Sequence, residues 1–211
     1  AGPAFEGGML RFGMAGADGA IEAVHINEDE FVYQVIGDFE PDGICGSGLV
    51  DILAELRRVE WMSPEGRFAG GRDDFTIAPS KGITFSRSDA SQLAQAKASN
   101  ASGQRILLRA LGLDAQEVDH VYLAGGFANA IDVENAIEIG FLAQVRPENV
   151  ERVGNSALRG AAMLLLSRRR RDALSDIIGR IEHVELETEP DFFELFVDGC
   201  LFHPIPNVPA A

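Results

Sequence analysis

The sequence predicts an α/β fold in which β-hairpins come first and helices flank a mixed sheet. Two observations carry this prediction. Before position 88, short apolar stretches alternate with polar turns, as in hairpins. After it, helical periodicity alternates with single apolar strands, an order typical of α/β domains. The length of 211 residues suits one domain of ordinary size or two small ones, and we expect residues 1–211 to form a single domain.

The first part of the chain predicts two hairpins around a helix. Residues 19–26 and 31–37 have the alternation of strands and are joined by a polar turn. Residues 43–58 predict an amphipathic helix that begins in a glycine cluster. Its apolar stripe, spaced i, i+3, i+4 and i+7, consists of Leu49, Ile52, Leu53 and Leu56. An exposed loop at 64–74, rich in Gly, Arg and Asp, leads to a second hairpin at 75–86.

A long helix is predicted next, with Ser88 and Asp89 as its start signals. Small residues crowd its middle, in "LAQAKASNASG", and predict close packing against a neighbour. The helix resumes through "QRILLRAL" and ends at Gly112, where a left-handed cap is expected.

The last third of the chain alternates strands and helices. A strand is predicted at 118–124 and a helix at 133–140, which Gly140 closes. A second helix covers 159–167 after the turn "VGNS". Residues 183–186 predict a final strand, and a short helix is expected from Asp191 onward.

The charge of the chain argues against nucleic acid and anionic membranes as partners. There are 33 acidic and 18 basic residues, so the net charge is -15. The basic cluster Arg168 to Arg171 follows an apolar helical segment, which predicts a solvated helix C-terminus. Apolar runs such as "AAMLLL" are far shorter than the roughly 18 residues of a membrane span.

The cysteines indicate the cellular compartment of the protein, and the start of the chain indicates whether the sequence is a fragment. Cys45 and Cys200 are the only cysteines, which indicates a reduced, cytoplasmic protein and excludes an all-cysteine iron-sulfur cluster built from this chain alone. No signal peptide is visible. The chain opens "AGPAFEGG", without an initiator Met, so we expect it to be a fragment of a longer protein.

The stretch "VYLAGGFANAID", residues 121–132, places two glycines at the end of an apolar strand. Glycine weakens a strand, so the pair needs an explanation. One is a plain turn into a helix that Asn129 or Asp132 caps. The other is a flat ligand lying against bare backbone at Gly125 and Gly126. The dipeptide alone favours the plain turn.

The turn "GICGSG", residues 43–48, feeds a helix and suggests either a tight turn or a phosphate cradle of backbone N–H groups. It is not a Walker loop, because no Gly-Lys-Ser/Thr follows. Cys45 sits where a helix N-terminus would activate a thiol, although a buried structural cysteine is favoured. Ser47 is interpreted as a helix cap rather than a nucleophile.

Lys97 and the histidines complete the list of polar candidates. Lys97 either faces solvent, the favoured interpretation, or reaches a phosphate or ribose. The histidines share no metal-ligand spacing, so we assign them no chemistry and predict no metal site. They are His25, His120, His183 and His203.

Five segments, in order, resemble the C-terminal ATPase region of the reductive activators of corrinoid proteins. The segments are "AGPAFEGG", "PDGICGSGLVDILAEL", "QLAQAKAS", "VYLAGGFANAID" and "GNSALRGAAMLLL". This family belongs to the superfamily of actin, hexokinase, acetate kinase and the heat-shock chaperones, called ASKHA. The resemblance covers nearly the whole chain and implies a ribonuclease H-like, actin-like ATPase lobe.

The resemblance also implies a function. Such activators carry a two-iron two-sulfur ferredoxin domain, a linker and a two-lobed ATPase that binds ATP with Mg²⁺. They drive electron transfer to an inactive Co(II) corrinoid protein and restore Co(I). Residues 123–127 match the adenosine motif, and the opening segment follows a phosphate hairpin. The resemblance and the glycine turns together assign cofactor binding to Gly2, Glu6, Gly7, Gly43, Gly46, Ser47, Gly48, Lys97, Gly125, Gly126 and Phe127.

The chain departs from the superfamily in lacking both Asp-Ile-Gly-Thr-like phosphate hairpins and the ferredoxin cysteines. It therefore resembles most of the second lobe, and the first lobe and ferredoxin domain would be partners outside this chain. We expect the turns at 43–48 and 124–129 to open onto one cleft. Two alternatives remain: a lobe of a dehydratase activator or small-molecule kinase, or a noncatalytic module that docks a partner.

Overall fold

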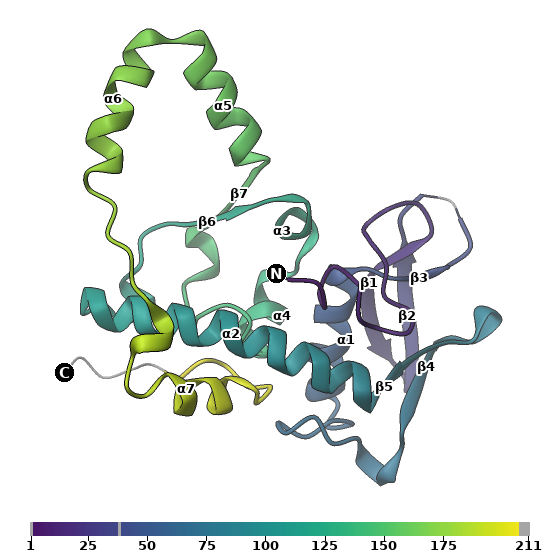
Figure 1. Ribbon diagram of the computed structural model, residues 1–211. Helices are drawn as coiled ribbons and strands as arrows, with labels where there is room; N and C mark the ends of the chain where they lie inside the picture. The colour runs from purple at the N-terminus through teal and green to yellow at the C-terminus, as the bar shows by residue number, and fades with distance from the viewer. Residues whose placement is uncertain (1, 38, 207–211) are drawn as a thin grey trace.

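The computed structural model describes residues 2–37 and 39–206 and confirms the α/β class (Figure 1). Strands β1 (Ala20–Asn27), β2 (Glu30–Val35) and β3 (Gly43–Ile44) form the first sheet, in the order β2-β1-β3. β1 runs antiparallel to β2 and parallel to β3, so the sheet is mixed, as predicted.

Helix α1 (Gly46–Arg58) packs along β1, and all of Gly46 to Leu56 is buried. Its apolar stripe lies in the core, as the sequence predicts. Polar side chains on another face of α1 bond to alternate residues of β1. The pairs are Ser47 with Glu22, Asp51 with Val24, and Glu55 with Ile26. The spacings match, because four helical residues rise about 6.0 Å and two strand residues about 6.6 Å.

Strands β4 (Asp74–Ala78) and β5 (Ile83–Ser86) form the second predicted hairpin. The loop before it is largely exposed but anchors Phe68, which is 6% exposed. The ring of Phe68 packs on Phe75, which also stacks against Trp61 at a centroid distance of 5.5 Å. These aromatic contacts fasten the hairpin to the sheet side of the core.

Helix α2 (Arg87–Leu111) begins at a capping box whose N-cap, Ser86, lies two residues before the predicted start signal Ser88. Ser86 accepts from the N–H of Asp89, and Asp89 accepts from the N–H of Ser86. Gly112 ends the helix with φ 63°, as predicted. The small residues of α2 pack against α7 (Phe192–Gly199). The approach is close, because a Cβ on Gly199 would lie 3.1 Å from the Cα of Ala98.

Strands β6 (Val121–Ala124) and β7 (Val150–Gly154) form a separate parallel pair. The strand β6 begins three residues later than predicted. Two short helices connect the strands: α3 (Gly126–Ala130) and α4 (Val133–Glu138). Asp132 caps α4 by accepting from the N–H of Asn135, which confirms one of the two predicted caps.

Helices α5 (Ser156–Leu166) and α6 (Arg168–Ile178) stand off the rest of the protein as a bent pair, green in Figure 1. We call residues 156–178 the arm. The prediction that Arg168 to Arg171 end a helix is wrong, because Ser167 caps a new helix that starts with them. Arg171 still serves a helix C-terminus, since it donates to the Leu164 and Leu165 carbonyls of α5.

The predicted strand at 183–186 is also wrong. Residues 181–185 have no regular secondary structure, and a 3₁₀ turn covers Leu186–Thr188. No neighbouring strand is available to pair with this segment within the described part of the chain. The short helix that follows it is confirmed as α7. Among the described helices, none combines the length and apolarity needed to cross a membrane.

Candidate functional site

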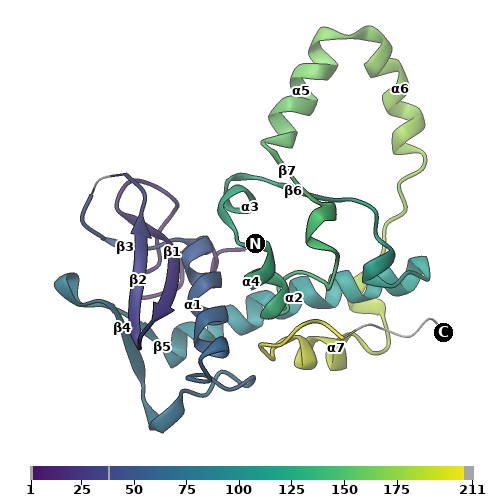
Figure 2. The ribbon, with the colours of Figure 1, turned by 180° about the vertical axis from the view of Figure 1, so that it is seen from behind.

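A cavity of about 800 Å³ lies between α2 and the β6-α3-α4 unit. Figure 2 shows that unit above α2, with the N-terminal end of the chain close by. One wall comes from β6 and α3, another from α2, and a third from the start of the chain. The lining residues are Gly2, Pro3, Ala96, Ser99, Asn100, Gln104, Val121, Tyr122, Leu123, Ala124, Phe127, Ala128, Ile131, Ala136, Phe141 and Leu142.

The cavity lining is apolar and uncharged, with amides on the α2 side. The side chains of Asn100 and Gln104 both donate to the Phe141 carbonyl oxygen, at 2.7 and 3.0 Å. The Gln104 oxygen also accepts from the N–H of Ala143. These bonds hold the segment after α4 against α2. The lining therefore suits a flat, uncharged group of a ligand rather than a charged one.

The two glycines of the turn lie between Ala124 and Phe127, which line this cavity, but neither glycine is itself among the lining residues. Gly125 has φ 102°, a conformation that side chains disfavour, and its N–H donates to the Gly154 carbonyl at the end of β7. A Cβ on either Gly125 or Gly126 would meet no protein atom within 4 Å. The space beside position 126 is therefore open, and packing inside the protein does not require a glycine there.

Phe127 connects the turn to the rest of the core. Its ring centroid lies 5.9 Å from that of Phe5 and 5.7 Å from that of Phe141. Phe5 and Phe141 are themselves 4.9 Å apart in an edge-on arrangement. This trio joins the start of the chain, α3 and the end of the α4 unit beneath the cavity. Sequence reasoning missed Phe5 and Phe141, since their partners are distant along the chain.

The opening segment contributes only part of its predicted set. Gly2 lines the cavity. Glu6 is exposed and lies outside the lining. Gly7 is buried with φ 81°, and a Cβ there would lie 2.2 Å from Met14 N, so its role is close packing.

The turn at 43–48 is packed tightly and does not line the cavity. A Cβ on Gly43, Gly46 or Gly48 would come within 2.6 Å of a backbone oxygen. The two predicted turns thus touch, through Gly46 and Phe127, but only the one at 124–129 opens onto the cavity. The glycines at 43–48 therefore fit the tight-turn interpretation.

Two further sequence interpretations concern the start of α1. Ser47 does not cap the helix: its hydroxyl donates to the Glu22 carbonyl at 2.7 Å, a partner 25 residues away. Cys45 occupies the N-cap position and makes no side-chain cap. Its thiol is 5% exposed and donates to the Ile21 carbonyl, which agrees with a structural cysteine.

Lys97 lies away from the cavity and is 1% exposed, so the solvent-facing interpretation is wrong. Its ammonium lies over the Phe202 ring at 5.8 Å. Burial lowers the pKa of Lys97 to about 8. Its electrostatic interactions with Cys200 and Asp198 raise that pKa, but they are smaller than the effect of burial. Lys97 therefore belongs to the packing of α2 against the C-terminal segment. Within the described residues, no three His, Cys, Asp or Glu side chains gather to hold a metal.

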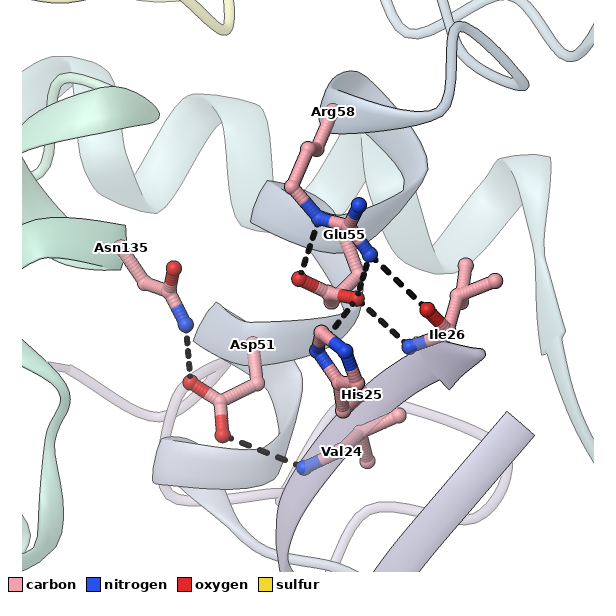
Figure 3. A network of polar contacts seen from close by, with 7 residues as sticks. All are labelled: Val24, His25, Ile26, Asp51, Glu55, Arg58 and Asn135. Atoms are coloured by element: carbon pink, nitrogen blue, oxygen red, sulfur yellow. Dashed lines mark hydrogen bonds and ion pairs between the residues drawn. The ribbon is translucent and has the colours of Figure 1, made fainter. Parts of the chain in front are cut away.

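A buried carboxylate pair on α1 was also missed by sequence reasoning (Figure 3). Asp51 accepts from the Val24 N–H at 3.1 Å and from the Asn135 side chain at 2.8 Å. Burial raises the pKa of Asp51 to about 6. The two hydrogen bonds lower that pKa but only partly offset the effect of burial.

Glu55, one turn along α1, has the guanidinium of Arg58 as a neighbour instead. Burial alone would raise the pKa of Glu55, but bonds from Arg58 and the Ile26 N–H hold it below its usual range. His25 also lies 3.0 Å from the carboxylate. The signal for the pair was present in the sequence, since Ser47, Asp51 and Glu55 recur every four residues in an apolar helix.

Comparison with known proteins gives three consistent matches. A family model described as the C-terminal domain of RACo, the ASKHA domain, matches residues 1–208. The corrinoid activation enzyme RamQ of Eubacterium limosum is 32% identical, over 95% of this chain and 38% of its own length. A solved reductive activator for corrinoid, iron-sulfur protein superposes with a TM-score of 0.85 at 34% identity, over 96% of this chain and 36% of that one. The chain thus spans less than two fifths of each relative.

Proposed function

The chain belongs to the family of RACo C-terminal ASKHA domains, and on that premise we propose that it is the nucleotide-binding lobe of an ATP-dependent reductive activator of corrinoid proteins. The relatives that it matches are corrinoid activators, which supports a corrinoid protein as the partner. The observation that carries the nucleotide assignment is the cavity lined by Ala124, Phe127 and Ala128, together with the open space at the neighbouring Gly125 and Gly126. The mostly apolar lining suits adenine and ribose.

The lobe contributes binding energy rather than electrons in this proposal. A two-iron two-sulfur cluster held outside this chain would supply the electron that converts Co(II) to Co(I), and ATP would supply the driving force. ATP acts by favouring one arrangement of the two lobes, which changes the affinity for the corrinoid protein. Cys45 and Cys200 are free cysteines, and in this proposal the lobe works in a reducing cytoplasm.

Two groups implied by the family do not fit the residues of this chain. An all-cysteine two-iron two-sulfur cluster needs four thiolates, and the chain has two cysteines. The cavity lining carries no carboxylate, so it offers no protein ligand for the Mg²⁺ that accompanies ATP. We therefore assign the cavity to the adenosine end of the nucleotide, and we place the groups that surround the γ-phosphate elsewhere in the longer protein.

The arm supplies a docking surface for the first lobe in this proposal. None of its residues is buried, although α5 is almost wholly apolar. Leu158, Leu165 and Leu166 are 67%, 80% and 88% exposed. A contiguous apolar helix face of this kind marks an interaction site. Both relatives extend well beyond the part that this chain matches, so the remaining polypeptide has ample length to cover the arm.

Substitution of Gly126 tests the nucleotide assignment. A Cβ at this position meets no protein atom within 4 Å, so we expect Gly126→Val to remain folded. The valine side chain would occupy ligand space and weaken binding by at least about tenfold, or 1.4 kcal/mol. Calorimetric titration of the chain with a nonhydrolysable ATP analogue measures the affinity, and a thermal melt reports the fold.

Gly160→Val is the matched control, because Gly160 is also a helical glycine whose Cβ would meet nothing, but it lies in the arm. We expect that variant to bind as the parent chain does. Unchanged affinity in a folded Gly126→Val variant would disprove the site. A parent chain that binds no nucleotide at all would favour the noncatalytic docking module.

A further inference from the structure

Helix α4 has one face on the cavity and another on α1. Ala136 lines the cavity, and its neighbour Asn135 points the other way, toward Asp51. The close view shows the Asn135 amide directed at the Asp51 carboxylate across the gap between the two helices (Figure 3). A displacement of Asn135 would therefore move Ala136 and the cavity wall with it.

The Asp51 carboxylate is also bonded to the first sheet. Its second oxygen accepts from the Val24 N–H, so the carboxylate is tied to the backbone of β1. The resulting chain of contacts runs from β1 through Asp51 and Asn135 to α4. It joins the first sheet to the unit that carries Gly125 and Gly126, although Asp51 and Asn135 are 84 residues apart in sequence.

Among the described residues, no Lys, Arg or His side chain is bonded to Asp51. The charges that act on its pKa are both acidic: Asp132, which caps α4, and Glu55 on α1. Arg58 and His25 contact Glu55 instead. The ionised form of Asp51 therefore relies on two neutral donors, the Val24 N–H and the Asn135 amide. Within the described part of the chain, Asn135 supplies one of the two hydrogen bonds that compensate the burial of Asp51.

From this arrangement we infer that Asn135 is a positioning residue, which sets α4 against α1 and so fixes the ligand-facing wall of the cavity. The contact is also sensitive to protons. Protonated Asp51 must donate its O–H, and both of its neighbours donate to it. The Asn135 amide can accept that proton only by turning its oxygen inward. The inference rests on the proposed function for the identity of the ligand.

The test uses the chain with Asn135→Ala and two readouts. Loss of the amide leaves a buried carboxylate short of a donor, and we expect nucleotide affinity to fall about tenfold, which corresponds to 1.4 kcal/mol. Without nucleotide, we expect amide hydrogen exchange in residues 126–140 to accelerate by a similar factor. Residues 74–86, in the distant hairpin, should exchange as before.

Rescue separates positioning from general destabilisation. The exchanged pair, Asp51→Asn with Asn135→Asp, keeps an acceptor for the Val24 N–H and a hydrogen bond between the helices. We expect it to recover affinity and exchange rates to within about threefold. Glu138→Gln, at an exposed position of the same helix, should match the parent chain in both readouts.

If Asn135→Ala fails to fold, the inference is tested instead by measuring nucleotide affinity as a function of pH. Nucleotide affinity of the parent chain should change between pH 5 and 7, and Asp51→Asn should flatten that profile. The inference is overturned if folded Asn135→Ala keeps the parent's affinity and exchange rates, or if both pH profiles coincide. A parent chain that binds no nucleotide refutes the proposed function alone, because hydrogen exchange still tests the position of α4.

Discussion

Gly46 and the ring of Phe127 are in direct contact. A Cβ at position 46 would lie 2.5 Å from Phe127 Cδ2 and 2.4 Å from the Phe5 carbonyl oxygen. Both distances are too short for any real contact, and the backbone at Phe5 has little room to move because that side chain is fully buried. The start of α1 thus depends on glycine for its approach to α3.

We expect Gly46→Ala to lower the free energy of unfolding by about 1–3 kcal/mol, as overpacking of a dense core does. Urea denaturation of the chain measures this loss. Gly160→Ala is the control, because a Cβ there meets nothing and alanine favours a helix by about 0.5–1 kcal/mol over glycine. Equal stability of the two variants would show that the contact between α1 and α3 is loose.

Stability should depend on pH through Asp51. Its pKa is about 6 in the folded chain against an ordinary value of 3.8, so the folded state binds more protons between these values. The free energy of unfolding therefore decreases as pH rises through this window, by up to about 3 kcal/mol. Asp51→Asn removes this loss and keeps an acceptor for the Val24 N–H. We expect the variant to equal the parent chain near pH 4 and exceed it at pH 8.

Urea denaturation at pH 4.5, 6 and 8 provides the measurement. Other titrating groups are shared by the two proteins, so they cancel in the difference between the curves. Parallel curves for the parent chain and Asp51→Asn would refute the assigned ionisation of Asp51.

The arm should tolerate polar residues that the core cannot. Leu165 and Leu166 are largely exposed, so we expect the double replacement Leu165→Ser, Leu166→Ser to shift the unfolding free energy by less than about 0.5 kcal/mol. It should also reduce self-association, measured by light scattering, because an exposed apolar patch is removed. Leu53→Ser, at a fully buried position, should instead destabilise the chain strongly. Unchanged scattering would show that the arm is not the adhesive surface.

We expect the chain alone to release no phosphate from ATP above background. Phosphoryl transfer needs charged groups and a metal around the γ-phosphate, and the cavity lining carries no charged residue. Steady-state phosphate release with Mg²⁺ measures this directly, with a longer activator that contains this region as the positive control. Comparable turnover by the two would place the catalytic groups within this chain, and Glu6, Asp42 and Lys97 would then be the first to substitute.

Many helices and turns could be predicted from the sequence, because the pattern that indicates each of them is contained in a few neighbouring residues. The stripe from Leu49 to Leu56, the cap at Asp132 and the left-handed turn at Gly112 are examples. Where an alternative partner exists, such signals mislead. Ser47 has the chemistry of a cap but bonds to Glu22, and Ser167 divides an apparent single helix in two.

The site was predicted in part. The sequence located the bare turn at Gly125 and Gly126, since paired glycines after a strand are unusual. It could not reveal that Lys97 packs on Phe202 or that Asn135 meets Asp51, because those partners are 105 and 84 positions away. Such contacts follow from how α2, α4 and the C-terminal segment fold together, and no short motif encodes them.

The ladder of α1 side chains along β1 has a consequence for solution behaviour. A strand edge with free N–H and C=O groups is a template on which another chain can add a strand. On β1 this edge is already occupied, since Ser47, Asp51 and Glu55 bond to Glu22, Val24 and Ile26. The helix therefore shields this edge of β1 from strand addition, a protection that a purely apolar α1 would not give even if it packed equally well.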